Sequence, residues 1–214
     1  MKKNITLILL FLATFISANA VDTVKVKQTQ IPILIDRTDN VLFYIRIEAQ
    51  QAKQLNEVTL QFGEDVNLSE IKAVKLYYGG TEAAQRAEQV YYAPVQYVPS
   101  NSPGKTRFAN SSYSIKVAEK LSPKNKVVFT SNYNLFPGIN YFWISLEMKP
   151  KTSLLSKIDV ELNSVKLDSK MAPLAFADES NVHRMGYGVR QAGDDGSAAF
   201  RIPGLVTSNK GTLL

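Results

Sequence analysis

The chain contains no cysteine, a single histidine and a single tryptophan among its 214 residues. Without cysteine no disulfide can brace the fold, so its stability must come from a hydrophobic core. A lone histidine without cysteine forms no recognisable zinc site, and the sequence has no calcium-binding loop of the EF-hand type. We therefore expect no metal and no cofactor, and we interpret His183 as a loop or packing residue.

Long runs of one charge are also lacking. The formal net charge is +6 at pH 7, and it falls to +4 if Lys2 and Lys3 are removed. The remaining lysines are scattered singly among acidic residues, unlike the basic arms that bind nucleic acid. The charge pattern therefore predicts no nucleic-acid partner, and it is compatible both with anionic glycans and with an ordinary solvated surface.

The longest apolar run lies at the N-terminus. Two lysines precede an apolar stretch from Ile5 to Ile16, and Ala18-Asn19-Ala20 follows as a small-x-small cleavage site. This order is typical of a secretory signal peptide, and the run is too short for a membrane-spanning helix. No cysteine follows the cleavage site, which excludes a lipoprotein anchor. We predict that residues 1–20 are a signal peptide and that the protein is exported, either to the periplasm or out of the cell.

Between residues 24 and 167 the apolar residues alternate with a period of two, which indicates half-buried strands. The predicted strands are Val24–Lys27, Val41–Glu48, Val58–Phe62, Val74–Tyr78, Tyr113–Val117, Lys126–Phe129, Tyr141–Met148 and Ile158–Leu162, with Val165–Leu167 as a ninth. A turn is predicted at Gly79-Gly80, and short helical turns at 68–71 and 81–89. Eight or nine such strands predict an all-β fold, an antiparallel and jelly-roll-like β-sandwich.

The composition changes near the end of the last predicted strand. Six of the eleven glycines lie after residue 185, and the stretch from Asp168 to Ser180 mixes proline, small residues and charges as linkers do. We predict a sandwich domain over 21–170, a linker over 171–180 and a second unit over 181–214.

Aromatic residues of the sandwich suggest a sugar-binding role, because exposed rings stack on the faces of sugars. Tyr91, Tyr92 and Tyr97 are candidates in a stretch that prolines keep irregular, and Trp143 is a candidate in the strand Tyr141–Met148. On that strand Tyr141 and Trp143 share one face while Phe142 and Ile144 share the other, and one face must belong to the core. The alternative interpretation places most of these rings in the core or in contacts between domains.

The most specific motif is Phe200-Arg201-Ile202-Pro203, which is followed by the strand-turn-strand pattern Gly204–Leu214 with Gly211 at the turn. It resembles the Phe/Tyr-Arg-Ile-Pro motif that opens the catalytic propeller of sialidases (neuraminidases), in particular secreted enzymes of the Bacteroides type. Such enzymes carry an N-terminal β-sandwich before a six-bladed propeller, so the resemblance implies that 181–214 begins a truncated propeller.

The resemblance implies a role for Arg201 as one of three arginines that bind the carboxylate of sialic acid. A planar guanidinium can bind a carboxylate through two parallel hydrogen bonds, which an ammonium group cannot reproduce. In the family, the tyrosine nucleophile, its glutamate partner and the acid/base aspartate follow later in the chain and match no residue here. Asp194 and Asp195 lie close to Arg201, but between two glycines they are interpreted as turn formers.

The sequence therefore predicts the N-terminal portion of an exo-α-sialidase, a retaining glycoside hydrolase that acts on sialylated glycans. By itself the chain is expected to be mainly the accessory sandwich and to be inactive. The alternatives are a non-catalytic glycan-binding or adhesion module, and a structural spacer.

Overall fold

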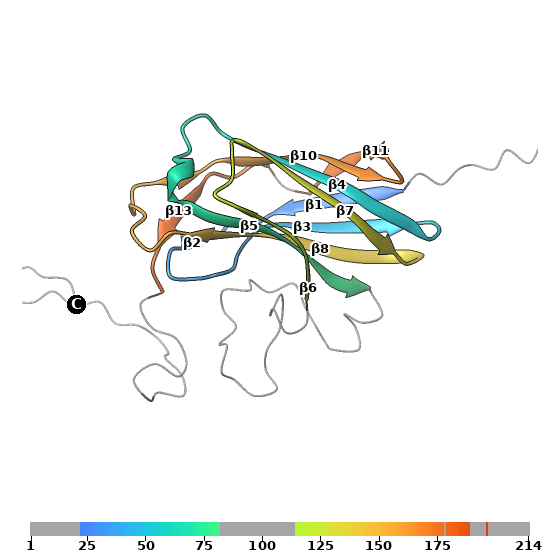
Figure 1. Cartoon of the computed structure of the whole chain (residues 1–214), viewed down its shortest axis with the longest axis horizontal. Helices are drawn as coiled ribbons and strands as arrows, with labels where there is room; N and C mark the ends of the chain where they lie inside the picture. Colours follow the sequence, from blue (N-terminus) through green and yellow to red (C-terminus); the bar gives the residue numbers. More distant parts are fainter. Residues whose placement is uncertain (1–21, 82–113, 178, 189–195, 197–214) are drawn as a thin grey trace, which may run out of the picture.

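Two layers of β-sheet form the molecule in a computed structural model, which describes residues 22–81, 114–177, 179–188 and 196 (Figure 1). The first layer is a six-stranded sheet with the order β12-β1-β3-β8-β5-β6, and the second is a four-stranded sheet with the order β11-β10-β4-β7. A small third sheet has the order β2-β13-β9. The elements are β1 (Thr23–Gln28), β2 (Ile33–Leu34), β3 (Asn40–Ala49), β4 (Lys53–Phe62), η1 (Leu68–Glu70), β5 (Ile71–Thr81), β6 (Ile115–Leu121), β7 (Lys126–Leu135), β8 (Gly138–Met148), β9 (Lys157–Ile158), β10 (Val160–Leu167), β11 (Lys170–Ala172), β12 (Leu174–Phe176) and β13 (His183–Gly186).

Strand alternation explains how the two layers pack. On β8, Phe142 and Ile144 point between the layers and are at most 1% exposed. The long strands of the sandwich pair antiparallel. Two short strands pair parallel: β12 with β1, and β13 with β2. The largest fully buried side chains are Phe43, Phe62, Phe129, Phe142, Ile33, Leu42, Ile45, Ile47, Leu55, Leu60, Ile71 and Leu76. The predicted all-β sandwich is therefore confirmed.

Two buried asparagines fasten the connections at opposite ends of the six-stranded sheet. The Asn40 amide accepts a hydrogen bond from Leu34 N (2.7 Å) and donates to Leu34 O (3.0 Å). The Asn140 amide accepts from Phe136 N (3.1 Å) and donates to Phe136 O (2.8 Å). Both side chains are fully buried, and such satisfied amides replace the backbone bonds that a turn leaves unmade.

The predicted turn at Gly79-Gly80 is wrong. β5 continues through both glycines to Thr81, and its pairing with β8 shifts register between Tyr78 and Gly80. Gly80 has φ of 97°, a conformation that glycine adopts without strain. The glycine pair therefore marks a β-bulge inside a strand.

The segment that the sequence predicts to be a linker contributes to the sheets. β11 pairs antiparallel with β10 and β12 pairs parallel with β1, while β13, at the start of the predicted second unit, lies between β2 and β9. These strands have three or four residues and no marked alternation, so the sequence alone does not reveal them. The start of the predicted second unit is accordingly held against the sandwich as far as Gly186, where β13 ends.

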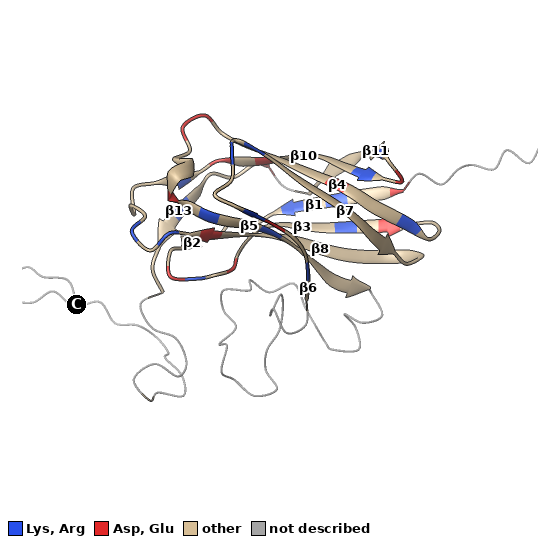
Figure 2. Cartoon of the chain, in the orientation of Figure 1, with Lys and Arg blue, Asp and Glu red and all other residues tan. Residues whose placement is uncertain are grey.

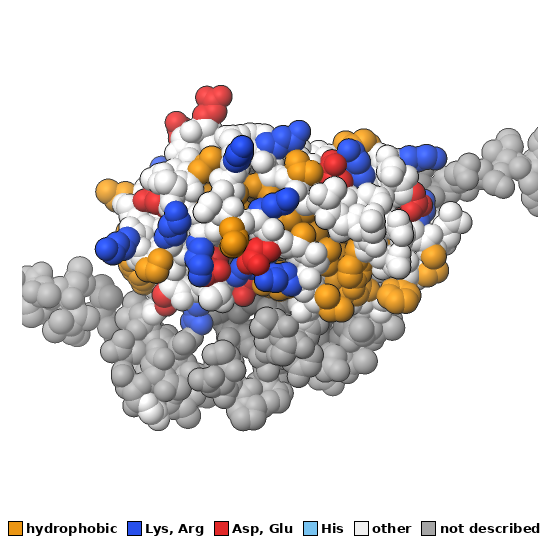
Figure 3. Space-filling view, viewed as in Figure 1, with side chains coloured by type: hydrophobic (Ala, Val, Ile, Leu, Met, Phe, Trp, Pro, Cys, Tyr) orange, Lys and Arg blue, Asp and Glu red, His pale blue; other side chains and the backbone are white. Residues whose placement is uncertain are grey.

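Basic and acidic residues are interleaved along the described strands (Figure 2), and on the face drawn in Figure 3 lysines and arginines lie among carboxylates and apolar side chains. Within the described ranges, no helix is long and apolar enough to cross a membrane.

Candidate functional site

Trp143 lies on the outer face of the six-stranded sheet, packed in a small aromatic cluster. Its indole stacks on Tyr77 with ring centroids 4.0 Å apart and planes 8° from parallel, and its Nε1 donates to Ser114 Oγ at 3.2 Å. Val41 and Tyr44 complete the cluster, and Trp143 is only 3% exposed. The indole therefore offers no open face for a sugar in this structure, and its role as a sugar ligand stays a prediction.

A buried ionic network lies beside this cluster. Asp39 accepts hydrogen bonds from Tyr77 Oη and Ser145 Oγ, both at 3.0 Å. Lys75 Nζ lies 2.8 Å from Glu147 and donates to Thr38 O at 2.7 Å. Because burial and the adjacent Asp39 carboxylate both disfavour a phenolate, the pKa of Tyr77 is raised far above its ordinary value.

Glu147 is the acidic centre of the same network. Burial alone would raise its pKa, but hydrogen bonds from Lys72 and Lys75 outweigh burial and lower it. Each charge thus has a partner, and the network ties the loop before β3 to β5 and β8. We interpret it as structural.

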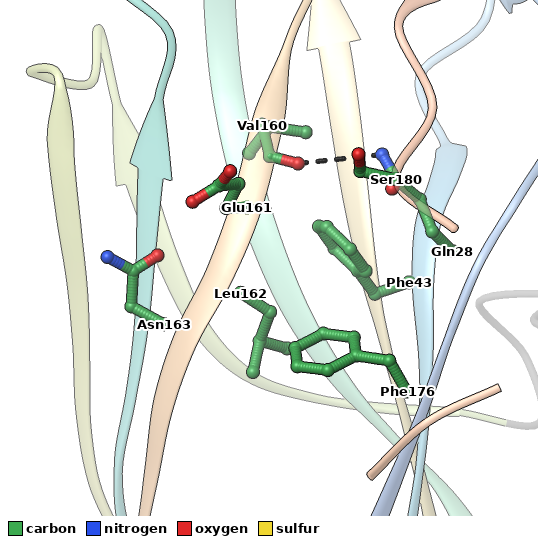
Figure 4. Close-up of a pocket in the computed structure, with 8 residues that line it drawn as sticks. All are labelled: Gln28, Phe43, Val160, Glu161, Leu162, Asn163, Phe176 and Ser180. Carbon is green, nitrogen blue, oxygen red and sulfur yellow. Dashed lines mark hydrogen bonds between the residues drawn. The ribbon is translucent and has the colours of Figure 1, made fainter. Parts of the chain in front are cut away.

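A cleft of about 490 Å³ opens between the layers, where β1 and β3 face β10 (Figure 4). Phe43, Leu162 and Phe176 point toward one another and form an apolar lining, whereas Glu161 and Asn163 extend from β10 at its margin. Phe43 and Leu162 are buried, but Phe176 is 54% exposed. The remaining lining residues are Gln28, Val160 and Ser180.

Gln28 closes one end of the cleft. Its amide nitrogen donates to Asn181 O at 2.8 Å and makes a longer contact of 3.5 Å with Val160 O, and its amide oxygen accepts from Asn181 N at 2.9 Å. Val160 belongs to the four-stranded layer, so this side chain bridges the two layers and fixes the segment before β13. A cleft of this size, with an aromatic ring and a few polar groups, has the usual features of a small-ligand site.

His183 is buried next to Gln28 at 1% exposure, which confirms the prediction of a packing residue. Its Nδ1 lies 3.0 Å from Ile31 O. Burial lowers the pKa of His183, and the hydrogen bond to Ile31 opposes this only partly. Burial thus favours the neutral form of the ring, which packs beside Gln28 at the end of the cleft.

Among the described residues, no three His, Cys, Asp or Glu side chains gather in a group that could hold a metal ion. Arg201, Tyr91, Tyr92 and Tyr97 lie outside those residues, as do Asp194 and Asp195. Sequence reasoning missed Phe176 and Gln28. The first lies in the segment predicted to be a linker, and the second follows the alternating residues of β1 without any signal of its own.

The fold and the cleft define a β-sandwich module with a concave surface at the margin between its layers. Comparison with known families identifies which kind of β-sandwich module this is. Residues 21–171 match the model of the N-terminal domain of BNR-repeat neuraminidase, and the chain belongs to this family.

Two relatives agree with this assignment. A sialidase of Bacteroides fragilis (strain YCH46) is 58% identical over 217 residues, an alignment that covers 100% of this chain and 40% of that protein. The solved structure of Hadza microbial sialidase Hz136 superposes with a TM-score of 0.73 at 43% identity, covering 88% of this chain and 36% of that one. The predicted relation to sialidases is confirmed, and the chain spans 40% or less of the length of these relatives.

Proposed function

We propose that this chain is the N-terminal portion of an exo-α-sialidase that removes terminal sialic acid from glycoconjugates with retention of configuration. The observation that carries the proposal is the family membership of 21–171 together with the motif Phe200-Arg201-Ile202-Pro203 that follows it. The sandwich is the accessory part, and hydrolysis belongs to the residues that follow it in the parent protein. Export through a signal peptide over 1–20 would place the enzyme where sialylated glycans are found.

Arg201 is the residue of this chain that we assign to the substrate. Sialic acid carries its carboxylate on the carbon of the scissile bond, so a guanidinium that binds both carboxylate oxygens also orients that bond. Pro203 restricts the backbone just after the arginine and thereby helps to fix its direction.

In the parent enzyme, Arg201→Lys is expected to lower kcat/KM for a fluorogenic sialoside by about 10- to 100-fold. The lysine keeps the charge but loses the paired hydrogen bonds, and a hydrogen bond to a charged group contributes about 1.5–3 kcal/mol. Arg184→Lys, a change at an exposed arginine of β13, is the matched control and should leave kcat/KM unchanged. Equal kcat/KM values for both variants would show that Arg201 does not bind the substrate. A parent protein without activity would contradict the proposed function.

A second candidate function is glycan binding by the sandwich, and the cleft beside Phe176 favours it. An exposed ring beside an amide, a hydroxyl and a carboxylate suits the apolar face and the hydroxyls of a neutral or sialylated sugar. If the cleft binds no sugar, the structural-spacer interpretation of the sandwich gains support.

Calorimetry of the 214-residue chain with sialyl-lactose and with lactose tests this second function. We expect weak binding that Phe176→Ala weakens by about two- to tenfold, the effect of about 0.5–1.5 kcal/mol from one aromatic contact. Phe136→Ala is the control, because Phe136 is similarly exposed, at 58%, and does not line the cleft. No heat with either sugar, or an equal loss in both variants, would contradict the assignment of the cleft.

A further inference from the structure

One end of the sandwich carries large apolar side chains in the open. Leu154 and Leu155, on the loop between β8 and β9, are 53% and 89% exposed, and Tyr187, just after β13, is 48% exposed. Figure 1 shows this loop and the end of β13 at the same end of the molecule, where apolar side chains are also visible in Figure 3.

The pairing of β9 with β13 brings the two segments that carry these residues to the same end of the sandwich. Arg184 pairs with Lys157 in an antiparallel register, so β13 runs onward toward the residues that precede β9. Just before β9 the chain turns, with Ser156 N donating to Ser153 O at 3.1 Å, and Leu154 and Leu155 are the two central residues of that turn. The turn and the end of β13 thus lie at one end of the sandwich, and we call the three exposed side chains there the exit patch (Leu154, Leu155 and Tyr187).

The exit patch is held in place by hydrogen bonds. On the loop side, the Glu70 carboxylate accepts from Ser156 Oγ at 2.6 Å and from Ser153 N at 3.3 Å. On the strand side, Ile35 N donates to Gly186 O at 2.9 Å and Gly188 N donates to Asp36 at 3.1 Å. A surface ordered in advance loses little conformational entropy when a partner covers it.

A buried polar atom near the exit patch, Arg37 Nε, lacks a hydrogen-bond acceptor within the described part of the chain. Tyr187, Pro150 and Arg37 line a cavity of about 230 Å³. Arg37 Nε is buried there and makes no hydrogen bond to any described residue. Because a buried donor without an acceptor costs about 1–3 kcal/mol, an acceptor on a covering surface would be favoured at this position.

We infer that the exit patch and Arg37 are the docking surface for the domain that follows residue 188 in the parent protein, an inference that rests on the proposed function. The patch lies where the described chain leaves β13, and this chain spans only 40% of the Bacteroides sialidase to which it is similar. A short tether gives an effective concentration of about millimolar, so a modest interface suffices for docking. The occupant needs an apolar surface and a carbonyl or carboxylate for Arg37.

Hydrogen exchange of the full-length parent protein and of the 214-residue chain tests the docking surface. We expect backbone amides in 151–157 and 185–188 to exchange at least about tenfold more slowly in the full-length protein, independently of its concentration. Leu155→Ser in the full-length protein should remove this protection. Met171→Ser is the control, since Met171 is 62% exposed on β11, at the other end of the molecule in Figure 1.

Equal exchange in the two proteins, or protection unaffected by Leu155→Ser, would overturn the inference. Protection that grows with protein concentration would also overturn it, because the occupant would then be a second copy. The sialidase activity of the same full-length sample is measured separately. Protection without release of sialic acid would count against the proposed function while supporting the docking surface.

Discussion

Replacing Phe142 with alanine is expected to lower the free energy of unfolding by about 3–5 kcal/mol. Phe142 is 1% exposed in the middle of β8, and its ring packs against Tyr78 at 5.0 Å and edge-on against Tyr133 at 5.7 Å between centroids. The truncation would leave a cavity where the two layers meet. With no cysteine in the chain, no disulfide offsets the loss.

Urea unfolding of the 214-residue chain measures this effect. Phe136→Ala is the matched control, a phenylalanine close to the start of β8 with 58% of its surface exposed, and it should change the free energy of unfolding by about 0.5 kcal/mol or less. If the two variants lost the same stability, Phe142 would not belong to the core between the layers.

The alternation of apolar residues was enough to predict the long strands, since β1, β3, β4, β7 and β8 each contain a predicted run. It was not enough to decide the inner face of β8, where both faces carry aromatic residues. The structure puts Phe142 and Ile144 in the core, and Trp143 in a second cluster on the outer face. Of the candidate rings, the structure describes Trp143, which is packed as in the alternative interpretation, and the nearby rings of Tyr77 and Tyr78 are buried too.

The short elements could not be predicted because their stability depends on partners distant in sequence. β2 has two residues and is paired with β13, about 150 residues later. The predicted strands Ile158–Leu162 and Val165–Leu167 merge largely into β10, because a register shift between Leu162 and Ser164 lets one strand continue. A bulge of this kind leaves only a weak mark on the alternation.

The candidate sites also differ in whether the sequence alone could predict them. Arg201 could be proposed from sequence because a short motif specifies its chemistry, whereas the cleft depends on two sheets meeting. Phe176 reaches the cleft only because β12 pairs parallel with β1, and Gln28 contributes only because Asn181 folds back beside it. Neither residue carries a local signal of that role.

The central proposal is that this chain is an accessory sandwich and that the sialidase activity of the parent protein resides in the residues that follow it. The most direct test compares the 214-residue chain with the full-length parent protein in the release of sialic acid from a fluorogenic sialoside, at equal concentrations. We predict steady turnover by the full-length protein and none above buffer by the 214-residue chain, which lacks matches for the tyrosine, glutamate and aspartate of the family pattern. Multiple turnovers by the 214-residue chain, or no release by the full-length protein, would contradict this account.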